Sequence, residues 1–399
     1  MTRVRLGAAL ASFWISTAGV LAAVTPPAPA GSILVPGAPT GVAVLDGGAR
    51  VVVGYEGRFA IAGGFALFRR SAAGYVLVNS VRTESAVEGV AVGPDGRTAV
   101  ATTRYGLAAV DLAALEAGTA KARSLRIGAA PDANQIVFAH DGAHVFFTVQ
   151  RYAELGVASV APGDAVNPPT LDVVAHVPLD RSPGGIALSP DGELLYVTSE
   201  TDAVDGKATP GFGDPRLGRE KCASNLGPSG VLSVIAADKA VADPAHAVSA
   251  KIAAGCAPTR VALSPDGNTA WVSVRGENRV VAFDTAKVRD DPAHALLASL
   301  AVGDVPVGLA LSLDGNTVLV ANSHRSRDAD DAREATLSVI DTAAALAGKP
   351  AVVASLPTGA LAREVVAAPS GGFFVTDYLS KAVAVVAKAS LRPAAPASR

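Results

Sequence analysis

The stretch from Gly185 to Gly192 reads GIALSPDG, and it leads into a second apolar run at Leu195–Val197. Proline presets the backbone angle of a tight turn, and aspartate and glycine tolerate the positions that follow, so the stretch indicates two short strands joined by a turn. Strict or looser copies of this turn recur along the chain at 46–48, 93–96, 140–142, 189–192, 264–267, 312–315 and 369–372.

The spacing of these turns decides the architecture. Turn positions 95, 141 and 191 lie 46 and 50 residues apart, and positions 266 and 314 lie 48 apart. Four-stranded propeller blades repeat about every 40–50 residues, whereas helical repeats are shorter. The apolar runs are short and rich in small and β-branched residues, which is typical of strands covered on both faces. The sequence therefore predicts an all-β, seven-bladed β-propeller of four-stranded blades.

The fifth repeat illustrates the four strands that we expect in each blade, at Arg260–Leu263, Ala270–Val274, Arg279–Asp284 and Leu296–Val302. The last repeat is one strand short, because only two strands, Phe373–Asp377 and Lys381–Val386, follow its turn. An orphan strand at Ser32–Val35 fits that gap. Closing the ring in this way removes the exposed edges of an open array, so we expect this N-terminal strand to complete the last blade.

Both ends of the chain differ in composition from the repeats. We expect a signal peptide and short linker over 1–30, the propeller over 31–388 and a disordered Pro/Ala tail over 389–399. Two arginines precede the apolar run Leu6–Val24, and small residues follow it, which is the order of a secretory signal. An uncleaved membrane anchor is the alternative. Cleavage would leave no membrane span and an exported protein, periplasmic or extracellular.

Cys222 and Cys256 are the only cysteines. An even count in an oxidising compartment indicates a disulfide. Cys222 belongs to the long insertion of the fourth repeat, and Cys256 to the link between the fourth and fifth blades. Both connections emerge on the same face of a propeller, so we predict that the two cysteines are bonded. Two free buried thiols are the alternative.

Charge and motifs limit the classes of partner. The net charge is −2, which gives no reason to expect nucleic acid as a partner. No phosphate-cradling loop, zinc pattern or haem-attachment motif is present, so we expect no cofactor and no metal. The acidic run Asp328–Asp331 lacks the glycine of a calcium loop and is interpreted as a solvated loop. We expect a monomer.

Candidate site residues are those that the repeat places at the loop-rich face, where second strands end and blades are linked. The second strands end with Tyr55, Arg104, Arg151, Glu200, Arg275, Asn322, His324, Asp377 and Tyr378, and the links contain Glu88, Asn134, Arg260, Arg363 and Glu364. Arginines converging on one rim favour an anionic ligand, through bidentate hydrogen bonding. The alternative is that these arginines pair with Glu88, Glu200, Asp377 and Glu364 around the channel.

The chain resembles the YVTN-repeat propellers of the seven-bladed, lactonase-like superfamily. The resemblance rests on strand ends such as Tyr196–Ser199 and Leu319–Asn322 and on the run Leu337–Thr342, and it covers about residues 32–388. It implies the propeller fold. Within that superfamily it also implies a choice between 6-phosphogluconolactonase-like enzymes, muconate-lactonising enzymes, redox propellers with attached cofactors and exported proteins of other roles. No catalytic residue is carried over from it.

Our leading hypothesis is an exported binding scaffold for a small anionic ligand, a glycan or a protein partner on the loop-rich face. Its candidate binding residues are Arg104, Arg151, Arg260, Arg275, Arg363, Glu88, Asn322 and Asp377. The alternative is a lactonase-type, 6-phosphogluconolactonase-like hydrolase, in which a rim arginine polarises the lactone and Glu200 or His324 moves the proton. A third hypothesis is a metal-assisted site built from Glu88, Asn134, Glu200 and Asn322.

Overall fold

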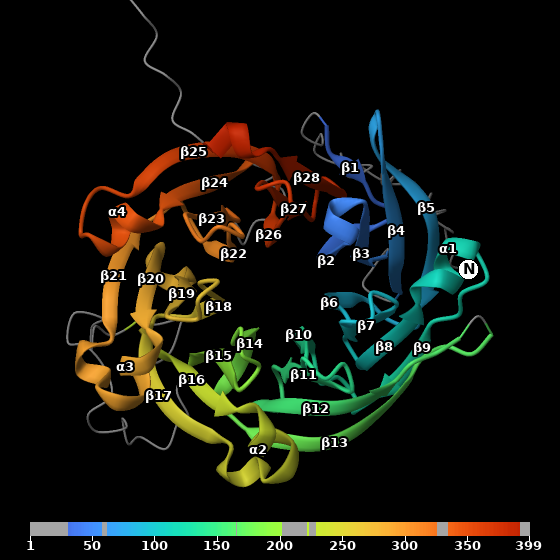
Figure 1. Cartoon of the computed structure of the whole chain (residues 1–399), viewed down its shortest axis with the longest axis horizontal. Helices are drawn as coiled ribbons and strands as arrows, with labels where there is room; N and C mark the ends of the chain where they lie inside the picture. Colours follow the sequence, from blue (N-terminus) through green and yellow to red (C-terminus); the bar gives the residue numbers. More distant parts are fainter. Residues whose placement is uncertain are drawn as a thin grey trace, which may run out of the picture.

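Seven four-stranded antiparallel sheets form a closed ring in the computed structural model (Figure 1). The structure describes residues 31–57, 62–164, 166–201, 222, 229–324 and 334–391. Each blade runs outward from its first strand, next to the channel, to its fourth strand at the outer edge. The predicted fold class, the number of blades and the number of strands in each blade are confirmed.

The strands of the first four blades follow in chain order. Blade 1 comprises β2 (Ala38–Leu45), β3 (Arg50–Glu56), β4 (Gly63–Ser71) and β5 (Gly74–Thr83), and blade 2 comprises β6 (Val87–Val92), β7 (Thr98–Thr103), β8 (Gly106–Asp111) and β9 (Arg123–Arg126). Blade 3 comprises β10 (Ala133–Phe138), β11 (His144–Val149), β12 (Glu154–Ala161) and β13 (Thr170–Pro178). Blade 4 comprises β14 (Arg181–Leu188), β15 (Leu194–Thr201), β16 (Gly230–Ala236) and β17 (Val248–Gly255).

Three blades complete the ring. Blade 5 comprises β18 (Pro258–Leu263), β19 (Thr269–Val274), β20 (Arg279–Asp284) and β21 (Leu296–Ala301), within two residues of the predicted bounds. Blade 6 comprises β22 (Pro306–Leu311), β23 (Thr317–Asn322), β24 (Glu334–Asp341) and β25 (Val352–Ala360), and blade 7 comprises β26 (Ala362–Ala367), β27 (Phe373–Asp377), β28 (Ala382–Val386) and β1 (Ile33–Leu34).

The N-terminal strand closes the ring as predicted. In β1, Ile33 lies opposite Val383 and Leu34 lies opposite Ala382, in antiparallel register with β28. Ile33 is 2% exposed and packs in a cluster that also contains Phe374, whereas Leu34 is 71% exposed. Burial of one side chain of a two-residue strand therefore seals the last blade against the first.

The repeated turns also hold neighbouring blades together. Gly267 has a φ of +74°, a conformation that glycine adopts without strain. A Cβ atom at this position would lie 3.0 Å from Cδ of Pro190, which belongs to the turn of the preceding blade. Gly315 stands in the same relation to Pro265, at 3.1 Å. The proline and the glycine of the motif therefore shape a turn and also pack against the next copy of it.

Short helices rather than simple turns follow four of the third strands, and three of these helices start at an Asp-Thr or Asp-Leu pair. The helices are α1 (Leu112–Ala117), α2 (Ala237–Ala242), α3 (Thr285–Asp290) and α4 (Thr342–Leu346), of which α2 has Ala236 at its N-cap. Asp111, Asp284 and Asp341 accept hydrogen bonds from backbone N–H groups three residues on, at 2.8, 3.0 and 2.8 Å. Each carboxylate is thus an N-cap, which satisfies a donor that the first helical turn leaves unpaired.

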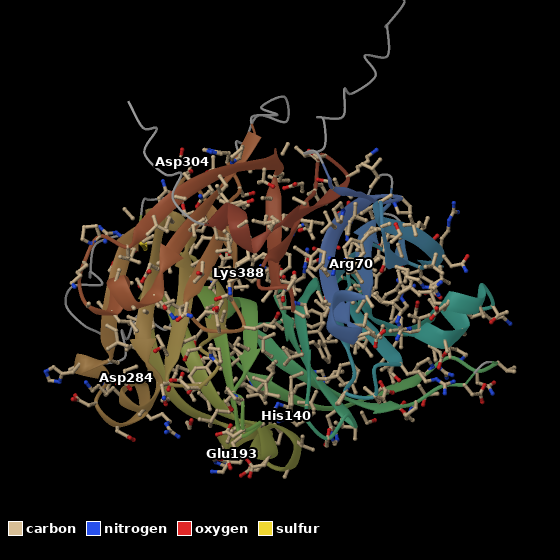
Figure 2. The ribbon with its side chains drawn as sticks, turned by 45° about the horizontal axis from the view of Figure 1, so that its top comes forward. Arg70, His140, Glu193, Asp284, Asp304 and Lys388 are labelled. Carbon is tan, nitrogen blue, oxygen red and sulfur yellow. A yellow bond between two sulfur atoms is a disulfide. The ribbon has the colours of Figure 1, made fainter. Side chains whose placement is uncertain are left out.

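The repeated Asp-Pro-Ala-His segments form 3₁₀ turns at Pro244–His246 and Pro292–His294. His246 and His294 each lie beside the aspartate three residues earlier, at 3.0 and 2.9 Å. Both histidines therefore belong to the structure of their turns. Figure 2 shows the two ends of blade 5, with Asp284 at the end that carries the turns and Asp304 at the end that carries the inter-blade links.

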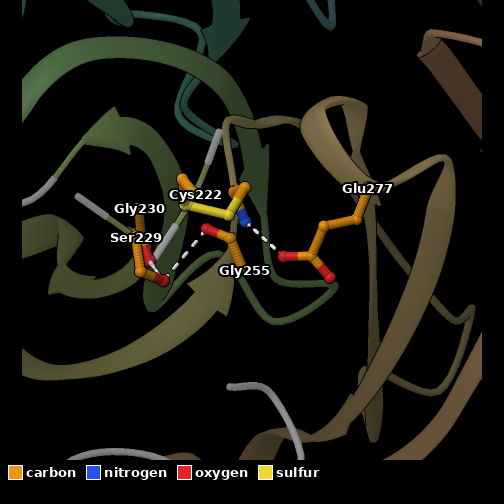
Figure 3. Close-up of a disulfide and its surroundings, with 6 residues drawn as sticks. Cys222, Ser229, Gly230, Gly255 and Glu277 are labelled. Carbon is orange, nitrogen blue, oxygen red and sulfur yellow. Dashed lines mark hydrogen bonds between the residues drawn. A yellow bond between two sulfur atoms is a disulfide. The ribbon is translucent and has the colours of Figure 1, made fainter. Parts of the chain in front are cut away.

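The disulfide between Cys222 and Cys256 is present, with 5.6 Å between the Cα atoms (Figure 3). The alternative of two free thiols is therefore wrong. Next to the bridge, the backbone N–H of Cys256 donates to Oε1 of Glu277 at 2.7 Å, and Oγ of Ser229 donates to the carbonyl of Gly255 at 3.1 Å (Figure 3). The bridge thus ties the fourth blade's insertion to the link that leads into blade 5. Within the described part of the chain, none of the helices has the length and apolarity needed to cross a membrane.

Candidate site at the channel mouth

A cavity of about 330 Å³ opens at the loop-rich end of the channel, and all seven blades contribute to its lining. Its position follows from the fold, because the second strands and the inter-blade links of every blade end there. Six charged side chains line it, namely Glu56, Glu88, Glu200, Arg260, Arg275 and Arg363. Asn134, Gln150, Ser323 and Tyr378 add polar groups. The cavity is therefore a concave, polar site of the size of a small-molecule pocket.

A hydrogen-bonded network crosses the channel at this site. Nε2 of Gln135 donates to Oε2 of Glu364 at 2.9 Å, and Nε of Arg260 donates to the same oxygen at 3.4 Å. Arg260 also donates through Nη2 to Oδ1 of Asn134 at 3.2 Å. Burial raises the pKa of Glu364, while the charge of Arg260 counteracts this effect. Side chains of blades 3, 5 and 7 are thereby joined across the ring.

A second pair links blade 7 to blade 2. Nη2 of Arg363 donates to Oε2 of Glu88 at 3.3 Å, and the guanidinium carbon lies 5.4 Å from the centre of the Tyr378 ring. Tyr378 in turn donates its hydroxyl to Oε2 of Glu56, in blade 1, at 2.7 Å. Burial raises the pKa of Glu88, the charge of Glu56 raises it further, and Arg363 lowers it. Burial and the Glu56 carboxylate both raise the pKa of the Tyr378 hydroxyl.

The third pair joins blades 4 and 5. Nη2 of Arg275 donates to Oε2 of Glu200 at 3.0 Å. A guanidinium carries five N–H donors in a fixed plane. Arg275 and Arg363 each use one terminal nitrogen for a carboxylate among the described residues, so each retains donors for a ligand in the cavity. Three of the predicted arginines, Arg260, Arg275 and Arg363, therefore line the cavity and also pair with carboxylates.

A smaller cavity of about 210 Å³ adjoins the first between blades 2 and 3. The two cavities share Glu88, Asn134, Gln150 and Arg363. The smaller cavity adds Arg104, an exposed residue whose side chain makes no hydrogen bond or ion pair with any residue that the structure describes. Arg151, in contrast, lies outside both linings and pairs with Asp132 at 2.9 Å.

Asn322, Asp377 and His324 also lie outside both cavity linings. Asn322 is 0% exposed, and its Nδ2 donates to the hydroxyls of Thr336 and Ser338. Asp377 is also 0% exposed, and it accepts a hydrogen bond from Thr358. Nδ1 of His324 lies 3.6 Å from an oxygen of Asp304, away from the cavity that the preceding residue lines. The acidic run Asp328–Asp331 lies outside the described residues.

The arrangement therefore brings Glu200 together with Arg275, but not with His324, the alternative candidate for moving the proton. Where the structure is described, no group of three or more His, Cys, Asp or Glu side chains could hold a metal ion. What the cavity offers chemically is a set of guanidinium donors, carboxylate acceptors and amides, which suits recognition of a polar ligand by hydrogen bonds.

Glu56, Gln135 and Gln150 belong to the site but were not singled out in the sequence. Tyr55 was chosen at the end of β3, yet its side chain is 7% exposed and packs in the core. Successive side chains of a strand point to opposite faces, so the neighbouring residue, Glu56, faces the channel. Polarity is the signal that could have found it, because a carboxylate next to a buried tyrosine has to face solvent or the channel.

No protein-family model matches the chain, and no curated protein does. Solved structures do match. The β-propeller domain of Cps50 (Swd1) from Myceliophteria thermophila superposes with a TM-score of 0.59 at 13% identity, over 89% of this chain and 98% of that one. A putative 6-phosphogluconolactonase from Bacteroides uniformis gives 0.56 at 16% identity, over 80% and 85%. Hydrazine synthase from Kuenenia stuttgartiensis gives 0.53 at 16% identity, over 76% and 84%. At these identities the likeness shows the propeller fold alone.

Proposed function

We propose that this protein is an exported, YVTN-type, lactonase-like propeller that binds a small molecule through an anionic group at its channel mouth. The observation that carries the proposal is the pair Arg275 and Arg363, whose guanidinium groups line the cavity with N–H donors to spare. Arginine presents these donors in the planar fork that matches a carboxylate or a phosphate. The concave shape favours a small molecule over a glycan chain or a protein surface.

Calorimetric titration of the full-length protein with gluconate, butanoate and phosphate tests this proposal. We expect at least one of these anions to bind and Arg275→Gln to weaken it about tenfold or more, the usual loss for a hydrogen bond to a charged group. Arg70→Gln is the control, because this exposed arginine lies in blade 1 outside the cavity. Equal effects of the two substitutions, or no binding of any anion, would refute the proposal.

Lactone hydrolysis is the second candidate function. The pairing of Glu200 with Arg275 inside the cavity favours it, since a carboxylate that moves a proton beside a guanidinium that polarises a carbonyl is the minimum such a reaction needs. The structural neighbour described as a putative 6-phosphogluconolactonase points the same way. Hydrolysis of a lactone panel should then exceed the spontaneous rate and fall to it in Glu200→Gln. A rate that chelator abolishes would instead favour the metal-assisted hypothesis.

Export is part of the proposal. The disulfide supports it, because such bonds persist in oxidising compartments. Mass spectrometry of the protein from the periplasmic and extracellular fractions should find a mature chain that starts after the apolar run Leu6–Val24 and contains the oxidised bridge. An intact N-terminus in the membrane fraction would contradict cleavage and support the anchor alternative.

A further inference from the structure

One carboxylate at the channel mouth has no arginine partner among the described residues. Arg260 pairs with Glu364, Arg275 with Glu200, and Arg363 with Glu88. Glu56 is the fourth carboxylate, and among the described residues its partner is the hydroxyl of Tyr378 rather than a cation. A carboxylate that lines a cavity without a cationic partner is a site for a positively charged group of a ligand.

We infer that the cavity binds a small zwitterion, with its ammonium group at Glu56 and Glu88 and its carboxylate at Arg275. This inference rests on the proposed function, because it assigns the second charge of the molecule whose anionic group the arginines hold. It also limits the size of the ligand, since both charges have to fit within one cavity of about 330 Å³. A lysine side chain of a protein partner would bring the ammonium without the carboxylate.

Each of the two carboxylates has one oxygen left for an ammonium. The other oxygen is engaged by a donor, because Oε2 of Glu56 accepts from Tyr378 and Oε2 of Glu88 accepts from Arg363. The Oε1 atom of each has no hydrogen bond within the described structure. The Arg363 guanidinium lies over the Tyr378 ring, so the partners of the two carboxylates contact each other in one cavity. An ammonium group carries three N–H donors and can therefore bind more than one acceptor there.

Glu56, which has no arginine partner among the described residues, and Arg275 come from blades on opposite sides of the channel. Glu56 and Glu88 come from blades 1 and 2, whereas Arg275 comes from blade 5, across the ring in Figure 1. A ligand with carboxylates at both ends would bring a second negative charge next to Glu56 and Glu88 and would be repelled there. A ligand with one charge of each sign meets a complementary charge at both ends.

A metal ion fits the same carboxylates less well. Calcium takes six to eight oxygen ligands, and magnesium requires octahedral geometry. Glu56 and Glu88 are two carboxylates whose other oxygens are already engaged, and no cluster of three or more potential ligands is found among the residues that the structure describes. An organic ammonium, which needs acceptors but no fixed coordination number, matches this pair better.

Calorimetric titration with three probes built on one carbon chain tests the inference on the full-length protein. The probes are 4-aminobutanoate, butanoate and glutarate, which carry an ammonium, a hydrogen atom or a second carboxylate on C4 of the same four-carbon chain. We expect 4-aminobutanoate to bind about tenfold or more tightly than butanoate, and glutarate to bind no better than butanoate. In Glu56→Gln the advantage of 4-aminobutanoate over butanoate should disappear, while the affinity for butanoate itself stays within about threefold.

Glu84→Gln is the matched control, because Glu84 is exposed and lies outside the cavity. Thermal melting of each variant checks that the fold is retained. Glutarate binding as tightly as 4-aminobutanoate, with no effect of Glu56→Gln, would overturn the zwitterion and leave the anionic ligand standing. Binding of none of the three probes would overturn the zwitterion, and the anionic ligand would be overturned with it only if gluconate and phosphate also fail to bind. Calcium chloride binding that depends on Glu56 and excludes 4-aminobutanoate would overturn the ammonium assignment.

Discussion

Asp377, at the end of β27, makes the stability of the propeller depend on pH in a way that can be measured. Its side chain is 0% exposed, and burial raises its pKa from 3.8 to about 7. The hydroxyl of Thr358 lies 3.0 Å from both carboxylate oxygens, and the backbone N–H of Gly359 also donates to the carboxylate. These hydrogen bonds lower the pKa but do not compensate for burial.

The magnitude follows from the change in pKa on folding. A pKa that rises from 3.8 to about 7 corresponds to about 4 kcal/mol, at about 1.4 kcal/mol per unit. Well below pH 3.8 the carboxyl is protonated in the folded and the unfolded state, so its contribution to the free energy of unfolding is fully present. As the pH rises toward about 7, the unfolded chain releases the proton first and the folded protein retains it. The free energy of unfolding therefore falls across this window and then levels off.

Urea unfolding at a series of pH values, for the wild type and Asp377→Asn, measures this effect. Fluorescence of Trp271, which is 1% exposed, reports unfolding. The asparagine does not titrate, so the free energy of unfolding of the variant should rise relative to the wild type by about 3 kcal/mol between pH 4.5 and pH 8. The comparison removes the titration of all other groups, because both proteins share them.

Asp172→Asn is the control, since Asp172 is exposed on β13. Relative to the wild type, Asp377→Asn should gain more free energy of unfolding with rising pH than this control does. A difference that stays constant with pH for Asp377→Asn would refute the reasoning, because it would mean that burial at the end of β27 leaves the proton affinity of the carboxyl unchanged.

Three further predictions concern the ring itself. Replacing both disulfide cysteines with serine should lower the free energy of unfolding by about 2–4 kcal/mol, given their separation of 34 residues, and reductant should reproduce the loss in the wild type only. Gly96 has a φ of +63° and open space around it, so Gly96→Ala should lower the free energy of unfolding in urea by about 1 kcal/mol. Gly267→Ala should lower it by about 1–2 kcal/mol more, because the new Cβ meets Pro190. Equal losses for the two variants would contradict packing between turns. Ile33→Ala should cost about 2–4 kcal/mol and Leu34→Ala less than about 0.5, so similar melting temperatures for the two variants would contradict ring closure through β1.

The fold could be predicted because the signals for it are local and repeated. A Ser-Pro-Asp-Gly turn such as 264–267 fixes two strands by backbone preference alone, and seven copies leave one architecture of that period. The orphan strand could be placed by counting, since a closed ring leaves no unpaired edge. The short helices could not be predicted in the same way, because aspartate followed by threonine, as at the start of α3, serves a turn and an N-cap equally well.

The candidate site could be predicted only up to the choice of strand ends and links. Seven blades each supply side chains to one channel mouth, so residues that are hydrogen-bonded there are far apart in sequence. Gln135 and Glu364, for example, are separated by 229 positions. Nothing local to either residue specifies the other. A shift of one residue in a strand end exchanges a core side chain for a channel side chain, which is why Tyr55 was chosen and Glu56 was missed.

The presence of Glu56 changes which ligands the channel mouth can bind. With Tyr55 in the wall instead, each carboxylate of the site would pair with an arginine, and a simple anion could compete for each guanidinium. With Glu56 there, one carboxylate has a hydroxyl as its partner rather than a cation, and it lines the same cavity as Glu88. An anion then gains binding energy from Arg275 but loses part of it to repulsion by the Glu56 carboxylate across the cavity. A ligand that also carries a positive charge turns that repulsion into attraction, so the strand register at the end of β3 selects the charge of the ligand.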